Sequence, residues 1–258
     1  MSAACVEPVA EPAFGRRAST YETSASVQAW LAGWLEEWLE PGWPAGCEVI
    51  EVGAGTGLFT RRLAGRGTLR AMDLCAGMVR EGRERVPGVG WTQGDALKLG
   101  PGSCDRLYSS AMLQWVGDPR TAMQTWCEAL RPGGRMLHGL FVSPTLPELG
   151  ELEPSAMPLR WRDVGVWREA MERAGLRVLR WETRTVEALH ASALAFLRSL
   201  HATGVTPAKP RLGAGRLRQL LRAYDERHRC EEGGVRATWT ALRIEAEKPP
   251  RLGEAAAG

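Results

Sequence analysis

The residues best suited to chemistry lie in one short stretch, where an acid precedes three glycines. Glu51 lies in the apolar segment 49–52, and Gly53, Gly55 and Gly57 follow at alternate positions. Glycines at such a turn let the backbone pass close to a ligand, and the first N–H groups of a following helix face its polar end. A carboxylate here would repel pyrophosphate but accept hydrogen bonds from an ammonium group. The stretch therefore favours a ligand with an ammonium end over a nucleoside diphosphate.

The glycine spacing also argues against a dinucleotide site. Such sites use G-x-G-x-x-G, and the position of the third glycine is occupied here by Leu58. The observed pattern is E-x-G-x-G-x-G. Taken alone, it is also compatible with any tight corner between a strand and a helix.

Two further acids follow candidate strands. Asp73 ends the segment 69–73, about 20 residues after the glycines, where an acid is placed to accept from two ribose hydroxyls. Asp95 comes soon after the segment 89–93. Each acid alone is compatible with a solvated loop. Three acids in order, each with a strand candidate, predict a nucleoside-type ligand at the carboxyl ends of a parallel sheet.

The surrounding chain alternates strands and helices. Apolar runs and helical periodicity predict strands at 49–52, 69–73, 89–93, 105–109, 135–142, 176–186 and 235–247. Helices are expected at 27–39, 58–64, 76–85, 119–130, 163–174, 190–203 and 216–227. The segment 131–134, Arg-Pro-Gly-Gly, is expected to be a turn. This order predicts an α/β fold with a Rossmann-like, mostly parallel sheet, an antiparallel last strand and a helical cap.

We expect one domain over residues 1–258. Residues 1–13 and 249–258 are predicted to be disordered, 14–42 to form an N-terminal cap helix, and 43–187 to form the core with a short cap loop at 143–162. Residues 188–234 are predicted to be a helical insertion over the site, followed by the last strand at 235–248.

Composition narrows the classes of protein. A net charge of +3 is too small to argue for nucleic-acid binding, and no run approaches the ~20 apolar residues of a membrane span. The first fifteen residues lack the apolar core of a secretion signal, and the six cysteines form no C-x-x-C pair. We expect a cytoplasmic, monomeric protein with reduced thiols and no metal site.

The insertion is basic. Between 205 and 230 only Asp225 and Glu226 oppose seven Lys or Arg residues: Lys209, Arg211, Arg216, Arg218, Arg222, Arg227 and Arg229. Two interpretations stay open, a solvated helix face or a docking surface for an acidic partner.

The E-x-G-x-G-x-G pattern resembles motif I of the class I S-adenosylmethionine-dependent methyltransferases. Over most of its length the chain resembles the malonyl-acyl-carrier-protein O-methyltransferases of biotin synthesis. The similarity is carried by the segments 14–21, 113–115 (L-Q-W), 145–149 (T-L-P-E-L), 160–161 and 199–205. The chain departs from this family at Ala54, Leu159 and His201, and in the degraded stretch 235–240.

The resemblance implies S-adenosylmethionine as cofactor and a malonyl group on an acyl carrier protein, or malonyl-coenzyme A, as substrate. The implied cofactor-binding residues are Glu51, Gly53, Ala54, Gly55, Thr56, Gly57, Asp73, Leu74, Met78, Asp95, Ala96 and Ser110. Within this set Asp95 would accept from the adenine amino group, and Met78 would lie under the adenine.

Three residues are candidates for the methyl-transfer step. Arg160 would hold the substrate carboxylate with a bidentate pair of hydrogen bonds; alternatively it is a surface arginine. Tyr21 would close over the methyl group or bind the carboxylate, or it is a packed tyrosine. Gln114, with Trp115, would line the transfer channel, or Trp115 is a core residue under the loop.

Three classes of function remain open at this point. They are carboxyl methylation of a malonyl thioester, methylation of another small acid or metabolite, and binding without catalysis. The basic insertion favours the first over the second, because a free small acid needs no protein-docking face. The intact acids and glycines argue against the third.

Overall fold

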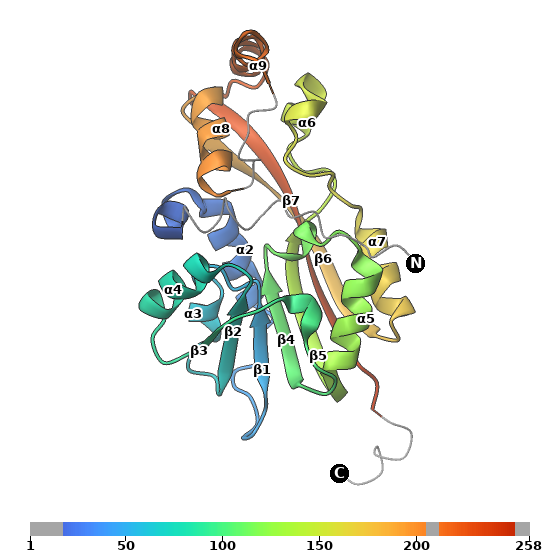
Figure 1. Ribbon diagram of the computed structural model, residues 1–258. Coiled ribbons are helices and arrows are strands. Elements are labelled where there is room, and N and C mark those ends of the chain that lie inside the picture. Colours follow the sequence, from blue (N-terminus) through green and yellow to red (C-terminus); the bar gives the residue numbers. More distant parts are fainter. Residues whose placement is uncertain (1–17, 205–211, 251–258) are drawn as a thin grey trace.

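The computed structural model describes residues 18–204 and 212–250 (Figure 1). Seven strands form one sheet in the order β3-β2-β1-β4-β5-β7-β6. The strands are β1 (Val49–Val52), β2 (Leu69–Asp73), β3 (Gly90–Gln93), β4 (Cys104–Ser110), β5 (Leu130–Phe141), β6 (Arg177–His190) and β7 (Val235–Glu247).

Strand directions confirm the predicted fold class. Each neighbouring pair among β1 to β5 is parallel, whereas β7 lies between β5 and β6 and is antiparallel to both. The strand order reverses at β1, which has β2 on one side and β4 on the other. Ligands of open α/β sheets bind outside the carboxyl ends of the strands at such a switch point. Three predicted cofactor residues, Glu51, Asp73 and Ser110, lie at or next to the carboxyl ends of β1, β2 and β4.

Helices cover both faces of the sheet. The α-helices are α2 (Ser26–Glu36), α3 (Thr60–Leu63), α4 (Ala76–Arg85), α5 (Pro119–Ala129), α6 (Pro147–Leu152), α7 (Val164–Arg173), α8 (Ala193–Ala202) and α9 (Ala214–Arg227). The described residues also form the short 3-10 helices η1 (Ala18–Ser24), η2 (Ala96–Lys98), η3 (Leu113–Trp115) and η4 (Pro154–Ala156). One apolar cluster joins α5 and α7 to one face of the sheet, and two further clusters join α2, α3 and α4 to the other.

The N-terminal helix differs from the cap predicted for 14–42. Its buried residues Leu31, Trp34 and Leu35 pack on the sheet, and α2 contacts β4, β5 and β7. Arg243 of β7 lies over the Trp34 ring, with its Cζ 4.5 Å from the ring centroid, and donates to the Trp34 carbonyl at 2.6 Å. The helix is therefore part of the core layer, and within this segment η1 lies near the predicted site.

Two boundaries within the core also differ. The strand β5 begins at Leu130, so the predicted turn at 131–134 lies within it as an irregular stretch. Its partners shift from Cys104↔Leu130 to Arg106↔Arg135, and Gly133 takes a φ of 76°. The helix after the glycines begins only at Thr60, because 53–59 form the turn.

The helical insertion stands on a ribbon of two long strands. Only the segment 241–247 of β7 pairs with β5, whereas β7 pairs with β6 along nearly its whole length. The other half of the ribbon extends beyond the sheet to α8 and α9 at the top of Figure 1. Because β6 continues to His190, the insertion spans 191–234, and the loop 143–162 contains α6 and η4. We call these two segments the cap. The segments 1–13 and 251–258, and residues Lys209 and Arg211, lie outside the described residues.

Candidate functional site

The glycine turn has one open position. Gly53, Gly55 and Gly57 all have positive φ, between 57° and 95°. A Cβ on Gly53 would lie 2.1 Å from Cγ of Met112, and one on Gly57 would lie 2.8 Å from Cγ2 of Val86. A Cβ on Gly55 would meet no atom within 4 Å. Packing therefore requires glycine at the outer two positions. The space for a ligand is at Gly55.

Glu51 presents an unsatisfied carboxylate oxygen at this turn. The residue is 1% exposed, and its Oε2 is buried without a hydrogen-bond partner among the described residues. Burial raises the pKa of Glu51 to about 8, and the negative charge of Asp73 adds to the rise. An unpaired buried acceptor is costly, so a cationic donor here would relieve the penalty. This matches the predicted ammonium partner.

Asp73 joins the end of β2 to the glycine turn. Its Oδ2 accepts from the Gly55 N–H at 2.8 Å, and its Oδ1 accepts from the Cys75 N–H at 2.9 Å. Burial raises the pKa of Asp73, and these two hydrogen bonds oppose the rise. Each carboxylate oxygen can accept a second hydrogen bond. Asp73 can therefore brace the turn and still accept from two ligand hydroxyls.

Asp95 also begins a short helical segment. Its Oδ1 accepts from the Leu97 N–H at 2.9 Å as the N-cap of η2, and its Oδ2 lies 3.8 Å from Lys98 Nζ. The neighbouring Ala96 carbonyl accepts from Trp126 Nε1 at 2.8 Å. The loop after β3 is thus fixed to α5, which holds its acid near the end of the strand.

The other predicted cofactor residues lie in the turns after β1 and β2, at the end of β4 and, for Met78, in α4. Ala54 donates its N–H to the Met72 carbonyl at 2.9 Å, while Leu74 is exposed after β2. Ser110 is the last residue of β4. Met78 is buried against Tyr21 and Cys75.

Glu22, which the sequence did not single out, fastens η1 over the glycine turn. Its Oε1 accepts from the Thr56 hydroxyl at 2.9 Å and from Arg61 Nη2 at 2.6 Å. Its Oε2 lies 3.7 Å from Arg85 Nη1. We call η1 the strap, because Glu22 connects it to the glycine turn, to Arg61 of α3 and to Arg85 of α4. Only its position beside the predicted Tyr21 could have drawn attention to it.

Tyr21 lies in the strap and faces the cofactor-site residues. Burial, together with the charges of Asp73 and Glu22, raises the pKa of the phenol well above its ordinary value. Tyr21 packs with Met78 and Cys75. The structure therefore brings the predicted Tyr21 and Met78 together beside the acid that ends β2, with the phenol protonated.

Gln114 lies at the end of β4 on a constrained loop. Its Nε2 donates to the Ala111 carbonyl at 2.7 Å, and its Oε1 is buried without a partner among the described residues. Ala111 has a φ of 54°, which is unfavourable for a residue with a Cβ. Strain of this kind gathers at functional sites. Within the described chain the buried amide oxygen thus lacks a donor that a ligand could supply.

Arg160 is exposed and makes no hydrogen bond or ion pair with another described residue. Its neighbour Trp161 packs edge-on to Trp239, with ring centroids 6.3 Å apart. Trp161 and Trp115 both pack against the same apolar cluster under the cap. The loop is thus fixed beside the cluster that Gln114 adjoins, but no contact joins Arg160 to Tyr21 or Gln114. Its role stays a prediction.

In the segment 145–149 (T-L-P-E-L), Thr145 and Glu148 make hydrogen bonds to β7. Thr145 donates to the carbonyls of Val142 and Thr240 and accepts from the Thr240 N–H at 3.1 Å. Both carboxylate oxygens of Glu148 accept from Thr238, one from its N–H and one from its hydroxyl. These bonds fasten the loop 143–162 to β7. The segment therefore positions the cap.

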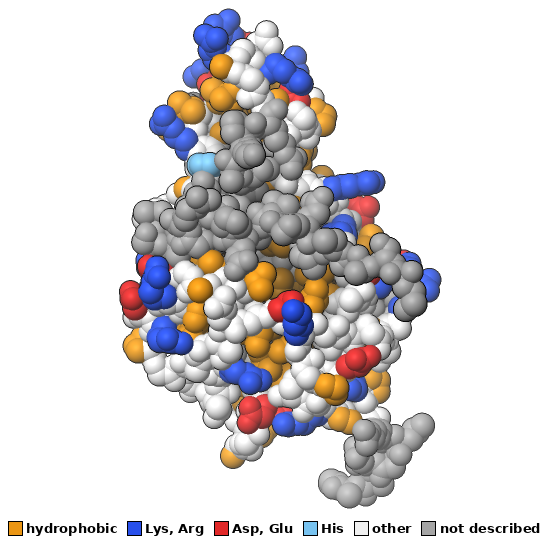
Figure 2. Space-filling model, viewed as in Figure 1, with side chains coloured by type: hydrophobic (Ala, Val, Ile, Leu, Met, Phe, Trp, Pro, Cys, Tyr) orange, Lys and Arg blue, Asp and Glu red, His pale blue; other side chains and the backbone are white. Residues whose placement is uncertain are grey.

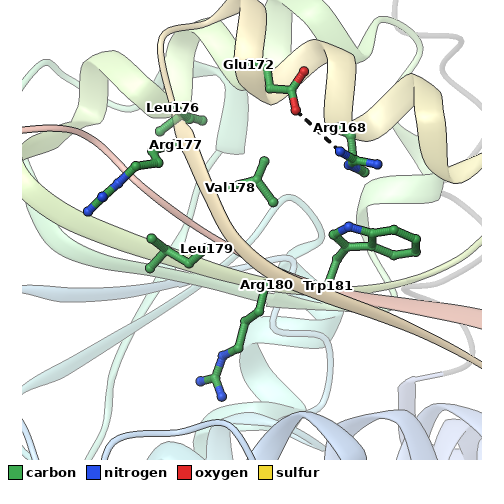
Figure 3. A pocket seen from close by; sticks show the side chains of 8 residues that line it. All are labelled: Arg168, Glu172, Leu176, Arg177, Val178, Leu179, Arg180 and Trp181. Carbon is green, nitrogen blue, oxygen red and sulfur yellow. Dashed lines mark ion pairs between the residues drawn. The ribbon is translucent and has the colours of Figure 1, made fainter.

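Two other features can be set aside. His138 Nδ1 lies 2.8 Å from Ser109 Oγ, but both side chains are fully buried, and burial lowers the pKa of His138 to about 3. No substrate reaches this pair. A hollow along the edge strand β6 is lined by Arg168, Glu172 and 176–181 (Figure 3). The ion pair between Arg168 and Glu172 occupies one side of it, and it contains no predicted site residue.

The comparisons with known proteins agree with this geometry. The family described as a methyltransferase domain matches residues 50–138. The malonyl-[acyl-carrier protein] O-methyltransferase of Hahella chejuensis is 30% identical over 88% of this chain and 85% of that protein. The chain belongs to the malonyl-[acyl-carrier protein] O-methyltransferase family. Members of this family are S-adenosylmethionine-dependent methyltransferases, and so is this protein.

Other relatives differ in how much of the chain they match. A biotin biosynthesis bifunctional protein of Cellvibrio japonicus is 30% identical over 85% of the chain, which spans about half of that protein, 46%. A trans-aconitate 2-methyltransferase of Deinococcus radiodurans is 42% identical, but over 34% of the chain and 35% of that protein. The YcgJ protein of Bacillus subtilis has the same fold, with a TM-score of 0.61 over 85% of this chain and 98% of that one, at 17% identity.

The site residues of this methyltransferase fit its cofactor. The unpartnered oxygen of Glu51, the open space at Gly55 and the carboxylate of Asp73 provide an ammonium acceptor, room for a chain and a hydroxyl acceptor. Within 18–204 and 212–250 no three potential metal ligands are grouped. None of the helices in these ranges has the length and apolar character needed to cross a bilayer.

Proposed function

We propose that this protein methylates the free carboxylate of malonyl-acyl-carrier protein, giving the methyl ester used in biotin synthesis. The observation that carries the proposal is the conjunction of the Glu51–Gly55–Asp73 site with family relatives that match over most of the chain. The match to trans-aconitate 2-methyltransferase is closer in identity but covers a third of each chain, so it supports the shared class of enzyme more than the substrate.

Bound S-adenosylmethionine supplies a methyl group on a positively charged sulfur. In this proposal Glu51 binds the ammonium end, Asp73 the ribose hydroxyls and Asp95 the adenine amino group. The other cofactor contacts are proposed for Gly53, Ala54, Gly55, Thr56, Gly57, Leu74, Met78, Ala96 and Ser110. The strap, fastened by Glu22, excludes water from the same space.

The enzyme needs to position the substrate more than to activate it. A malonyl carboxylate is already ionised near pH 7, so no general base is required. Holding a nucleophile at contact distance and in line supplies much of the rate enhancement of such a displacement. We assign Arg160 to the carboxylate, while Tyr21 and Gln114 provide a hydroxyl and an amide oxygen beside the cofactor residues.

We propose that the chain is one catalytic domain acting as a monomer in the cytoplasm. The loop 143–162 and the insertion 191–234 form the cap over the carboxyl ends of the strands, and the strap closes the third side. Five described cysteines are free thiols, which suits a reducing compartment.

A panel of acceptors tests the proposal. Methyl-transfer rates are measured with malonyl-carrier protein, malonyl-coenzyme A, free malonate and trans-aconitate under identical conditions. We expect malonyl-carrier protein to have the highest kcat/KM and the two free acids to react weakly. A preference for trans-aconitate or malonate over both thioesters would contradict the proposal and show that the substrate is a free small acid.

A further inference from the structure

The basic residues of this chain are unevenly distributed. The insertion 191–234 carries eight Lys or Arg and four acids, a net charge of +4, whereas the whole chain has a net charge of only +3. The remainder of the protein is therefore net negative. Figure 2 shows basic side chains at the tip of the molecule, over α8 and α9. The insertion therefore carries the net positive charge of the chain.

The arginines of the insertion 191–234 form fewer ion pairs than the arginines in the rest of the described chain. Sixteen arginines form ion pairs with acids among the described residues. In the described parts of α8 and α9 this is true of Arg216 alone, which pairs with Glu153 at 2.6 Å. Arg198 of α8 and Arg218 and Arg222 of α9 are exposed and pair with no acid in the described chain. Arg218 bonds only to a carbonyl of its own helix, that of Ala214. The positive charge is thus left for an external partner.

The helix α9 holds its two arginines on a fixed base. Leu220 and Tyr224 are buried, and Tyr224 donates to the Arg236 carbonyl at 2.9 Å. Positions 218 and 222 lie on the opposite side of the helix from Leu220, about 6 Å apart along its axis. Asp225 accepts from the Ala193 N–H at 2.7 Å and so joins α9 to the start of α8. The arginine pair therefore faces outward from a packed element.

The same cap is connected to the catalytic end. The helix α8 packs against the strap, which Glu22 ties to the glycine turn. The helix α9 packs against α6, and the pair Arg216–Glu153 joins α9 to the loop that carries Arg160. A protein bound to the outer side of α9 would therefore sit above the carboxyl ends of the strands.

We propose that Arg218 and Arg222 of α9, together with Arg198 of α8, dock the acidic surface of the acyl carrier protein that presents the malonyl group. This inference rests on the proposed function and specifies where its partner binds. Complementary charge steers association and orients the partner, while the thioester arm reaches the site.

The test compares two acceptors that share the reacting group. Malonyl-carrier protein contains the proposed docking partner, and malonyl-pantetheine has the thioester arm without the protein. The double variant Arg218→Glu, Arg222→Glu should raise KM for malonyl-carrier protein about tenfold at low salt, and the difference should shrink above about 0.5 M salt. Its kcat/KM for malonyl-pantetheine should equal that of the wild type.

A matched control reverses the same charge elsewhere. Arg70 and Arg80 are exposed and unpaired in the described chain, so Arg70→Glu, Arg80→Glu makes the same change in net charge outside the cap and should leave both acceptors unaffected. If the α9 reversal does not fold, Arg218→Gln, Arg222→Gln gives a smaller loss on the same acceptor. Equal losses on both acceptors, no loss on either, or an equal loss in the control would overturn the docking assignment. Failure of the wild type to methylate either malonyl acceptor would instead overturn the proposed function.

Discussion

Glu22 and Thr56 form a hydrogen bond of 2.9 Å that joins the N-terminal strap to the glycine turn. The same carboxylate oxygen accepts from Arg61, and the other approaches Arg85. One side chain thus links the strap to the glycine turn, to α3 and to α4.

The first prediction concerns Glu22. Replacing it with alanine removes a charge-assisted hydrogen bond of roughly 1.5–3 kcal/mol, so the strap should open more often. We expect affinity for S-adenosylmethionine to fall about tenfold, mainly through faster dissociation, as measured by stopped-flow fluorescence. Glu36→Ala is the control, because Glu36 ties α2 to Arg62 and Arg66 without touching the turn. A similar loss of affinity in both variants would show that general loosening, and not the strap, is responsible.

The second prediction concerns the pH dependence of Glu51. Its pKa of about 8 in the folded protein lies above the ~4.3 of an exposed glutamate, so between these values the folded state keeps a proton that the unfolded state has lost. The stability of the cofactor-free protein should therefore fall as pH rises through this window, by about 1.4 kcal/mol per pH unit. Thermal unfolding from pH 5 to 8 measures the slope, and Glu51→Gln should remove that contribution.

Cofactor binding should also release a proton at Glu51. An ammonium group favours the ionised carboxylate, so near pH 7 binding converts the protonated form to the charged one. Calorimetry in buffers of different ionisation enthalpy detects the release. If Glu51→Gln released the same proton as the wild type, another group would be the ammonium acceptor.

The third prediction separates backbone strain from ligand contact. Gly55 and Gly46 both have positive φ, at 57° and 78°, and a Cβ on either would meet no atom within 4 Å. Alanine at each position should cost a similar amount of stability, roughly 1 kcal/mol. Only Gly55→Ala should also weaken cofactor binding, by about tenfold or more, because its methyl group enters the proposed ligand space. Equal cofactor affinity in the two variants would remove Gly55 from the site.

The fourth prediction concerns Arg160. Alanine should sharply lower turnover of the malonyl acceptor while leaving cofactor affinity unchanged, and lysine should recover only part of it, because it lacks the bidentate geometry. Arg162→Ala is the control, since Arg162 donates to the Gly117 carbonyl at 2.6 Å and lies over the Trp167 ring. That variant should lose stability more than turnover. Wild-type turnover in both Arg160 variants would leave the substrate carboxylate to another cation.

Local pattern was enough to predict most of the sheet. The strands 49–52, 69–73 and 235–247 and the helix 76–85 have the predicted bounds, because apolar periodicity and end signals coincide there. Glu51 and Asp73 could be found for the same reason, since each lies at or next to the end of a strand with a strong signal.

The features that could not be predicted from the sequence depend on contacts between distant segments. Glu22 gains its role from Thr56, and Glu148 gains its role from Thr238, 34 and 90 residues away. The requirement for glycine at position 53 comes from Met112, which also lies far along the chain. No local spacing encodes such pairs. The amphipathic pattern of the N-terminal helix does not say whether its apolar side covers the sheet or the cap.

Transfer of an isotopically labelled methyl group tests the central claim most directly. The enzyme is given labelled S-adenosylmethionine with malonyl-carrier protein or, as a matched control, acetyl-carrier protein, which has the same arm and protein but no free carboxylate. We predict label on the malonyl form alone, released as methanol by mild base because it is held as an ester. Equal label on both carriers, or label that resists mild base, would contradict carboxylate methylation.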